Sequence, residues 1–100
     1  MNQDKVLSLL GLAQRAGKVA SGGFATEKAI KSRKASLVFV ADDSSDNTKK
    51  MFTDMCTHYN VPICFISDKV TLGHALGKEY RASLALLDDG FKNTIEKHMK

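Results

Sequence analysis

The stretch that decides the fold runs from residue 36 to residue 41 and reads Ser-Leu-Val-Phe-Val-Ala. It is apolar, contains β-branched side chains and has the length of a strand, without the polar alternation of a half-exposed one. Such a run is typical of a strand that is buried on both faces of a sheet. A strand of this kind needs covering layers on both sides, so we expect helices before and after it.

Two helices are predicted before this strand. Apolar side chains at helical spacing predict a helix over residues 3–16, and residues 18–21 form a short extended piece. The turn Gly22-Gly23 then leads into a second helix over residues 24–33.

After this strand, helices and strands alternate to the end of the chain. A polar loop over residues 42–46 caps the next helix, which shows the clearest apolar stripe and ends at Asn60. The remaining elements are a strand over residues 63–66 that we expect to be buried, a short helix ending at Gly77, a strand over residues 83–87, and a final helix after residues 88–90. This alternation predicts a three-layer α/β/α sandwich that forms one domain over residues 1–100.

Composition indicates an ordinary globular domain. The 100 residues are 43% hydrophobic and include one proline, which is too apolar for a disordered tail and long enough for one core only. No apolar run approaches the ~18 residues of a membrane span, and the first residues do not resemble a signal peptide. The two cysteines, Cys56 on the apolar stripe and Cys64 in a strand, are expected in the core. We therefore expect a cytoplasmic monomer without a membrane partner or a cofactor.

Positive charge is concentrated in the first third of the chain. The formal net charge is +4, from 15 Lys and Arg against 11 Asp and Glu. Residues 1–34 hold seven basic and two acidic side chains, a balance of +5, whereas residues 35–66 hold two basic and four acidic ones. A cationic face of this kind suits a polyanion such as RNA, although a solvated lysine-rich surface would have the same composition.

Most enzyme signatures are missing. We find no glycine-rich phosphate loop, no histidines or cysteines at zinc-binding spacing and no serine elbow. A Mg²⁺-dependent enzyme remains an alternative because Asp42, Asp43 and Asp68 follow strands, with Asp46 nearby. Asp46 and Asp68 also stand where helices need N-caps, which explains them without a metal. We therefore expect a protein that is not an enzyme.

The helix after the glycine turn has the features of a nucleic-acid site. Phe24, Lys28 and Lys31 are spaced i, i+4 and i+7 and share one face. The helix N-terminus after Gly22-Gly23 favours a phosphate, the lysines neutralise others, and the aromatic ring can stack on a base. The structural alternative is that Phe24 packs against the first helix while the lysines are solvated.

Two further groups of residues are assigned to the same nucleic-acid site. Arg33 and Lys34 extend the positive charge of this helix and are expected to contact phosphates. In the loop before the last strand, Tyr80 and Arg81 stand side by side and are followed by Ala82. The ring can stack on an unpaired base and the guanidinium can reach a phosphate. The alternative is an ordinary loop in which Tyr80 covers a helix end.

Several segments of the chain are collinear with a known family. They are Gly22…Lys28-Ala29-Ile30, residues 34–43 (Lys-Ala-Ser-Leu-Val-Phe-Val-Ala-Asp-Asp), Tyr59-Asn60-Val61-Pro62, and Leu72-Gly73 with Leu76-Gly77. Together they resemble the ribosomal-protein L7Ae/L30e family, and residues 9–18 and 46–50 resemble its small bacterial YlxQ-like branch in particular. The resemblance implies a four-stranded mixed sheet between helices. It also implies binding of structured RNA, either ribosomal or a kink-turn, which is a duplex sharply bent at a bulge beside sheared G·A pairs.

The resemblance also implies which residues meet the RNA. The segment from Gly22 to Lys28 would enter the major groove at the G·A pairs, and the segment from Tyr80 to Ser83 would meet the bulge. Most kink-turn binders carry Asn-Glu where this chain has Phe24 and Ala25, and each lost base contact costs about 1–3 kcal/mol of discrimination. We therefore predict an RNA-binding protein of altered specificity. The alternative is a protein-interaction or ribosome-associated module that does not bind isolated RNA.

Overall fold

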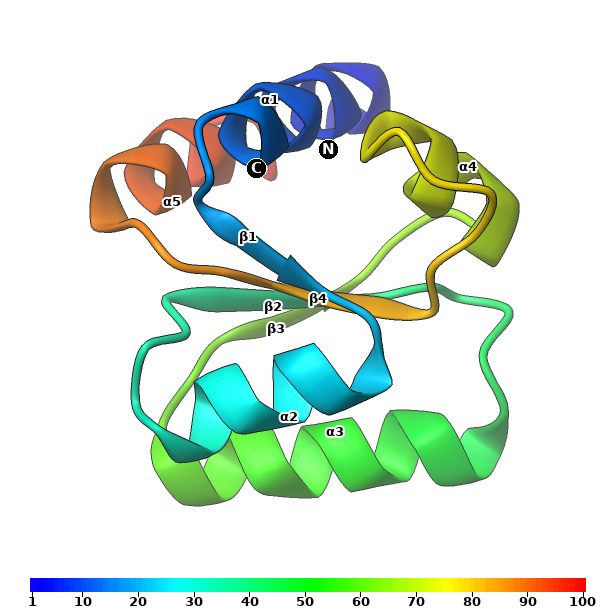
Figure 1. Ribbon diagram of the computed structural model, residues 1–100, viewed down its shortest axis with the longest axis vertical. Helices are drawn as coiled ribbons and strands as arrows, with labels where there is room; N and C mark the ends of the chain where they lie inside the picture. Colours follow the sequence, from blue (N-terminus) through cyan, green and yellow to red (C-terminus); the bar gives the residue numbers. More distant parts are fainter.

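The computed structural model describes every residue from Met1 to Lys100 and has five helices and one four-stranded sheet (Figure 1). The elements in chain order are α1 (Gln3–Arg15), β1 (Val19–Ser21), α2 (Gly23–Lys31), β2 (Leu37–Val40), α3 (Asp46–Tyr59), β3 (Ile63–Phe65), α4 (Lys69–Ala75), β4 (Ser83–Leu86) and α5 (Asp89–Glu96). Helices α1, α4 and α5 cover one face of the sheet, and α2 and α3 cover the other (Figure 1). The predicted three-layer α/β/α sandwich is confirmed. None of the helices combines the length and the apolar character that crossing a lipid bilayer requires.

The sheet is mixed, as the family resemblance implies. Its strand order is β1-β4-β2-β3, with β4 antiparallel to both neighbours and β2 parallel to β3. In this register Ser21, the last residue of β1, pairs with Leu84, while Val40 at the end of β2 pairs with Ser83. The chain leaving β1 and the chain entering β4 therefore meet at the same end of the sheet. This meeting point positions the candidate site.

The two central strands form the middle of the core. All four residues of β2 and all four of β4 are buried. Because side chains alternate across a strand, Leu37 and Phe39 pack in the cluster under α1, α4 and α5, while Val38 and Val40 pack in the cluster that holds side chains of α2 and α3. An apolar run without polar alternation is the pattern that burial on both faces requires, and the predicted strand is confirmed over Leu37–Val40.

The strand β3 lies at an edge of the sheet and is less buried than we predicted. It pairs only with β2, and Ile63 and Phe65 are half-buried beside a buried Cys64. The ammonium group of Lys49 lies 5.8 Å from the centre of the Phe65 ring and covers it in part. A short apolar run occurs both in edge strands and in central strands, so the sequence pattern alone does not show which position a strand takes in the sheet.

Helix α2 ends two residues earlier than we predicted. Its last residue is Lys31, Ser32 is the C-cap, and Arg33 adopts a left-handed backbone with φ of 61°. A left-handed residue ends a helix because it cannot continue the hydrogen-bonding pattern. Arg33, which the prediction includes in this helix, therefore lies beyond it, and so does Lys34.

Candidate nucleic-acid interface

The start of α2 and the loop before β4 form the two walls of one open groove. Ser21, Gly22 and Gly23 line one wall and residues 78–82 line the other, around a volume of about 530 Å³. The Gly22 amide donates a hydrogen bond to the Ser83 carbonyl at 2.9 Å, which joins the walls at their base. We selected these two segments separately in the sequence, and the fold brings them together.

The N-terminus of α2 differs from those of the other helices because no side chain caps it. Its N-cap is Gly22, whose φ of 97° a residue with a Cβ rarely adopts, whereas α1, α3, α4 and α5 are each capped by a side-chain oxygen. The first-turn N–H groups of a helix and its dipole favour an anion, and here no side chain supplies one. The glycine turn therefore leaves an anion-attracting helix end beside the groove.

One face of α2 carries the predicted aromatic and basic residues. Phe24 is 82% exposed, so the alternative in which it packs against the first helix is wrong. It lines a shallow cleft of about 460 Å³ together with Glu27, Lys28, Lys31 and Ser32. The Lys31 ammonium lies 2.7 Å from a Glu27 carboxylate oxygen, and this hydrogen bond raises the pKa of Lys31. Lys28 is exposed and forms no ion pair, so it is the free cation of this face.

The opposite wall presents one exposed ring and one restrained arginine. Tyr80 is 59% exposed. The Arg81 guanidinium donates to the Tyr80 carbonyl oxygen at 2.7 Å and to the Ser21 hydroxyl at 3.3 Å, which ties the loop to the end of β1. The Ala82 carbonyl accepts a hydrogen bond from the Ala41 amide at 2.8 Å. Arg81 thus holds the groove together while Tyr80 remains free to meet a ligand.

Two buried contacts that we did not predict hold these walls in place. Gly73 of α4 packs so tightly under the loop that an added Cβ would lie 2.3 Å from the Tyr80 Cα. On the other wall the Ser83 hydroxyl donates to the Thr26 hydroxyl at 3.1 Å, and both residues are fully buried. The sequence signal for the first contact is a glycine inside a predicted helix, which often marks a close approach. No comparable signal identifies the second.

The structure brings together only part of the predicted site. The residues gathered around the groove and the adjoining cleft are Gly22, Gly23, Phe24, Lys28, Lys31, Tyr80, Arg81 and Ala82. Arg33 and Lys34 line a different cleft with Asn60 and Lys92. Nine helical residues span about 13 Å, and Arg33 and Lys34 follow the end of α2 that lies farther from the groove.

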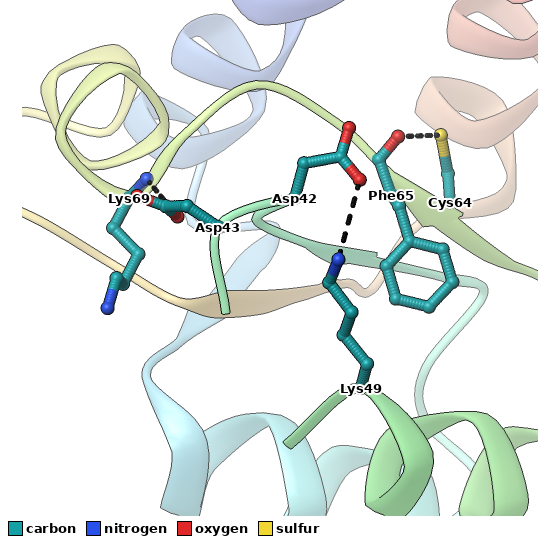
Figure 2. A network of polar contacts seen from close by, with 6 residues as sticks. All are labelled: Asp42, Asp43, Lys49, Cys64, Phe65 and Lys69. Atoms are coloured by element: carbon teal, nitrogen blue, oxygen red, sulfur yellow. Dashed lines mark hydrogen bonds and ion pairs between the residues drawn. The ribbon is translucent and has the colours of Figure 1, made fainter. Parts of the chain in front are cut away.

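The aspartates considered for Mg²⁺ have other partners (Figure 2). A carboxylate oxygen of Asp43 accepts a hydrogen bond from the Lys69 amide at 3.0 Å, and one of Asp42 lies 3.9 Å from the Lys49 ammonium. No group of three or more metal-ligating side chains comes together in the structure. The Asp43 contact joins the loop after β2 to the start of α4, and the Asp42 contact pairs the same loop with α3.

Both cysteines lie in the core, as predicted. Burial raises the pKa of the Cys56 thiol to about 11. Burial also raises the pKa of Cys64, and the nearby Asp42 carboxylate adds to the effect. The thiol of Cys64 lies 3.7 Å from the Phe65 carbonyl oxygen (Figure 2). Neither group is a thiolate near neutral pH, so neither has the activated form that nucleophilic catalysis requires.

Helix caps account for the aspartates that we placed at helix starts, with one correction. Ser45 rather than Asp46 caps α3, because the Ser45 hydroxyl accepts the Thr48 amide at 3.2 Å and Asp46 is already helical. Asp68 caps α4 as predicted, accepting the Thr71 amide at 2.7 Å. The hydrogen bonds from Thr71 lower the pKa of Asp68 because they favour the charged carboxylate.

The cap at Asp68 leads to a prediction about acid stability. A folded-state pKa below the ordinary value of about 3.9 means that the carboxylate stabilises the fold at higher pH and loses this effect as the pH falls through the folded pKa. Asn is as good an N-cap as Asp and does not titrate. Asp68→Asn should therefore leave stability near pH 7 almost unchanged and reduce the loss of stability in acid, measured by urea unfolding over a pH series. A Mg²⁺-dependent rise in melting temperature that the variant abolishes would instead support the metal site.

The fold and the groove together define a small α/β/α domain with an open site between an uncapped helix N-terminus and a loop. The chain belongs to the ribosomal protein L7Ae/L30e/S12e/Gadd45 family, which matches residues 4–96. The resemblance identified from the sequence is thereby confirmed.

Individual relatives place the chain near one group of bacterial proteins. It is 44% identical over 87 residues to the RNA-binding protein YlxQ of Bacillus subtilis (strain 168), a match that covers 87% of each chain. It is 40% identical over 96 residues to the RNA-binding protein YlxQ of Enterococcus faecium, covering 95% of this chain and 92% of the relative. The solved structure of a protein of unknown function from Bacillus halodurans superimposes with a TM-score of 0.89 at 34% identity, covering 93% of this chain and 94% of that one.

Proposed function

We propose that this protein binds structured RNA of a kink-turn-like or ribosomal kind, as a non-catalytic cytoplasmic monomer. The observation that carries the proposal is the groove itself. Two segments chosen separately for stacking and charge, at the start of α2 and over residues 78–82, line a single open depression. Membership of a ribosomal-protein family and likeness to two proteins named for RNA binding support the same function.

The groove and the adjoining cleft offer RNA three kinds of contact. The uncapped N-terminus of α2 receives a phosphate oxygen, and Lys28 neutralises a neighbouring phosphate without first leaving an ion pair. The exposed ring of Tyr80 in the groove and that of Phe24 in the adjoining cleft stack on unpaired bases. The backbone at Gly22 and Gly23 has no Cβ, so a base or phosphate can approach closely.

Specificity should differ from that of most kink-turn binders. Phe24 and Ala25 stand where those proteins carry Asn-Glu, and an aromatic ring and a methyl group cannot hydrogen-bond a guanine edge. Stacking and phosphate contacts tolerate many sequences, so we expect the shape of the RNA and its unpaired bases to be recognised more than G·A pairs.

The test is fluorescence anisotropy with three labelled RNAs. They are a kink-turn, the same RNA with its G·A pairs replaced by Watson–Crick pairs, and a plain duplex, each titrated between about 50 and 200 mM salt. We expect saturable, salt-sensitive binding that is tighter for the two bulged RNAs than for the duplex. Absence of binding to all three would contradict the proposal and favour a protein partner.

A single lysine substitution should weaken this binding without affecting the fold. Lys28→Ala removes the unpaired cation of the α2 face, so RNA affinity should fall and the slope of log K against log salt should drop by about 0.7–0.9. The melting temperature should not change, because the side chain is exposed. Lys5→Ala on α1 is the matched control, since it removes the same charge from the layer on the other face of the sheet. Equal effects of the two substitutions would mean that only net charge matters.

A further inference from the structure

A second cationic cleft lies at the end of the sheet opposite the groove. Three basic side chains, Arg33, Lys34 and Lys92, line it together with Asn60, Asp88 and Asp89, around a volume of about 600 Å³. The cleft lies where α2 and α3 end and α5 begins, whereas the groove lies where α2 begins (Figure 1). It is therefore separate from the site already described.

The basic side chains of this cleft are free of ion pairs. The ion pairs of the molecule join Lys31 to Glu27, Lys49 to Asp42 and Lys50 to Asp54, and none involves a cation of the cleft. The two carboxylates nearby already accept hydrogen bonds within the protein. Asp88 accepts the Phe91 amide at 2.8 Å, and Asp89 accepts the Ser36 hydroxyl at 2.8 Å. The cleft thus carries an excess of one positive charge, from three cations that form no ion pair and two carboxylates that cap and join elements of the fold.

Arg33 is held in an unusual conformation at the entrance of this cleft. Its φ of 61° is one that glycine adopts freely and that costs a residue with a Cβ some stability. Its guanidinium lies 5.3 Å from the centre of the Tyr59 ring, a cation–π contact that holds the side chain over α3. Glycine would relieve this strain, so the backbone conformation alone does not account for an arginine at this position.

The basic residues of α2 connect this cleft to the groove. Lys28, Lys31 and Ser32 line the shallow cleft along the helix, and Arg33 follows Ser32 directly. We propose that the cleft of Arg33, Lys34 and Lys92 is a second contact for the phosphate backbone of RNA, which extends along α2 from the groove. A nucleic acid carries a negative charge at every nucleotide, so it can satisfy cations placed at both ends of one helix. This inference rests on the proposed function.

The test uses a double variant in which a relaxed backbone at residue 33 offsets the lost contact with Tyr59. Arg33→Gly with Lys34→Ala removes two cations, and glycine suits the left-handed backbone at residue 33. The probes are the RNA that binds best among the three described above and the same RNA with a lengthened stem. For the longer RNA the salt slope should fall by about 1.5 and the affinity should fall with it, while binding of the shorter RNA should change less.

The controls separate this inference from the function on which it rests. Lys5→Ala with Lys97→Ala removes the same charge from α1 and the end of α5, and it should leave both RNAs bound as by the wild type. If the wild type binds RNA and the Arg33 variant binds the longer RNA equally well, the second contact is wrong and the groove stands. If the wild type binds no RNA, the proposed function itself fails. Binding of poly-glutamate as tightly as RNA, lost in the variant, would assign the cleft to an acidic polypeptide and overturn the RNA contact.

Discussion

Replacing Gly73 by alanine should destabilise the protein by about 1–3 kcal/mol or more, the range for overpacking a well-packed interior. The new Cβ would lie 2.3 Å from the Tyr80 Cα and 2.7 Å from the Tyr80 backbone nitrogen and carbonyl carbon. These are backbone atoms that no rotamer change can move aside. Alanine gains about 1 kcal/mol of helix propensity over glycine, which is less than the cost of moving a strand-entering loop against α4. Urea unfolding of the variant measures the difference.

Gly73→Ala should also weaken RNA binding, because residue 80 lines the groove. For stability, the matched control is Gly23→Ala, where an added Cβ meets nothing within 4 Å; it is no control for RNA affinity, because Gly23 lines the groove. That variant should be as stable as the wild type or slightly more so, since alanine is the better helix former. A Gly73→Ala protein with wild-type stability and RNA affinity would show that the contact between α4 and the loop is dispensable.

The layered fold could be predicted because the central strands have an unambiguous pattern. Burial on both faces demands apolar side chains at consecutive positions, and residues 37–40 and 83–86 meet that demand almost completely. Strand order is not encoded in such local patterns, so the mixed sheet came only from the family resemblance. The edge position of β3 was missed for the same reason.

The sequence predicts several individual residues of the candidate site, but it predicts less well which of them lie together in the fold. Residue type indicated Phe24, Lys28 and Tyr80, because exposed aromatic and basic side chains suit RNA. Arg33 lies apart from these residues because α2 ends before it, at a left-handed backbone conformation. Glycine is the usual sequence signal for such a helix end, and an arginine gives no such signal. The role of Gly73 depends on a contact between α4 and a loop seven residues away along the chain, which only the folded structure shows.

Replacing Phe24 by alanine should reduce RNA affinity by about 5- to 150-fold, which corresponds to the loss of about 1–3 kcal/mol from one stacked base. The ring is 82% exposed, so its removal takes little apolar area out of the core, and the melting temperature should stay close to that of the wild type. Anisotropy with the kink-turn RNA measures the affinity, and thermal unfolding followed by circular dichroism checks the fold.

Leucine at position 24 separates stacking from simple apolar contact. Phe24→Leu keeps an apolar side chain without a planar ring, so it should lose most of the affinity that Phe24→Ala loses if the ring stacks on a base. Near-wild-type binding by the leucine variant would mean that the ring only covers sugar or an apolar edge. Phe24→Trp, with a larger planar surface, should bind at least as well as the wild type. If RNA affinity follows the planarity of the side chain at position 24 while the melting temperature stays constant, base stacking is the main contribution of the α2 face. Stacking would then explain how the site binds RNA without polar contacts to a guanine edge.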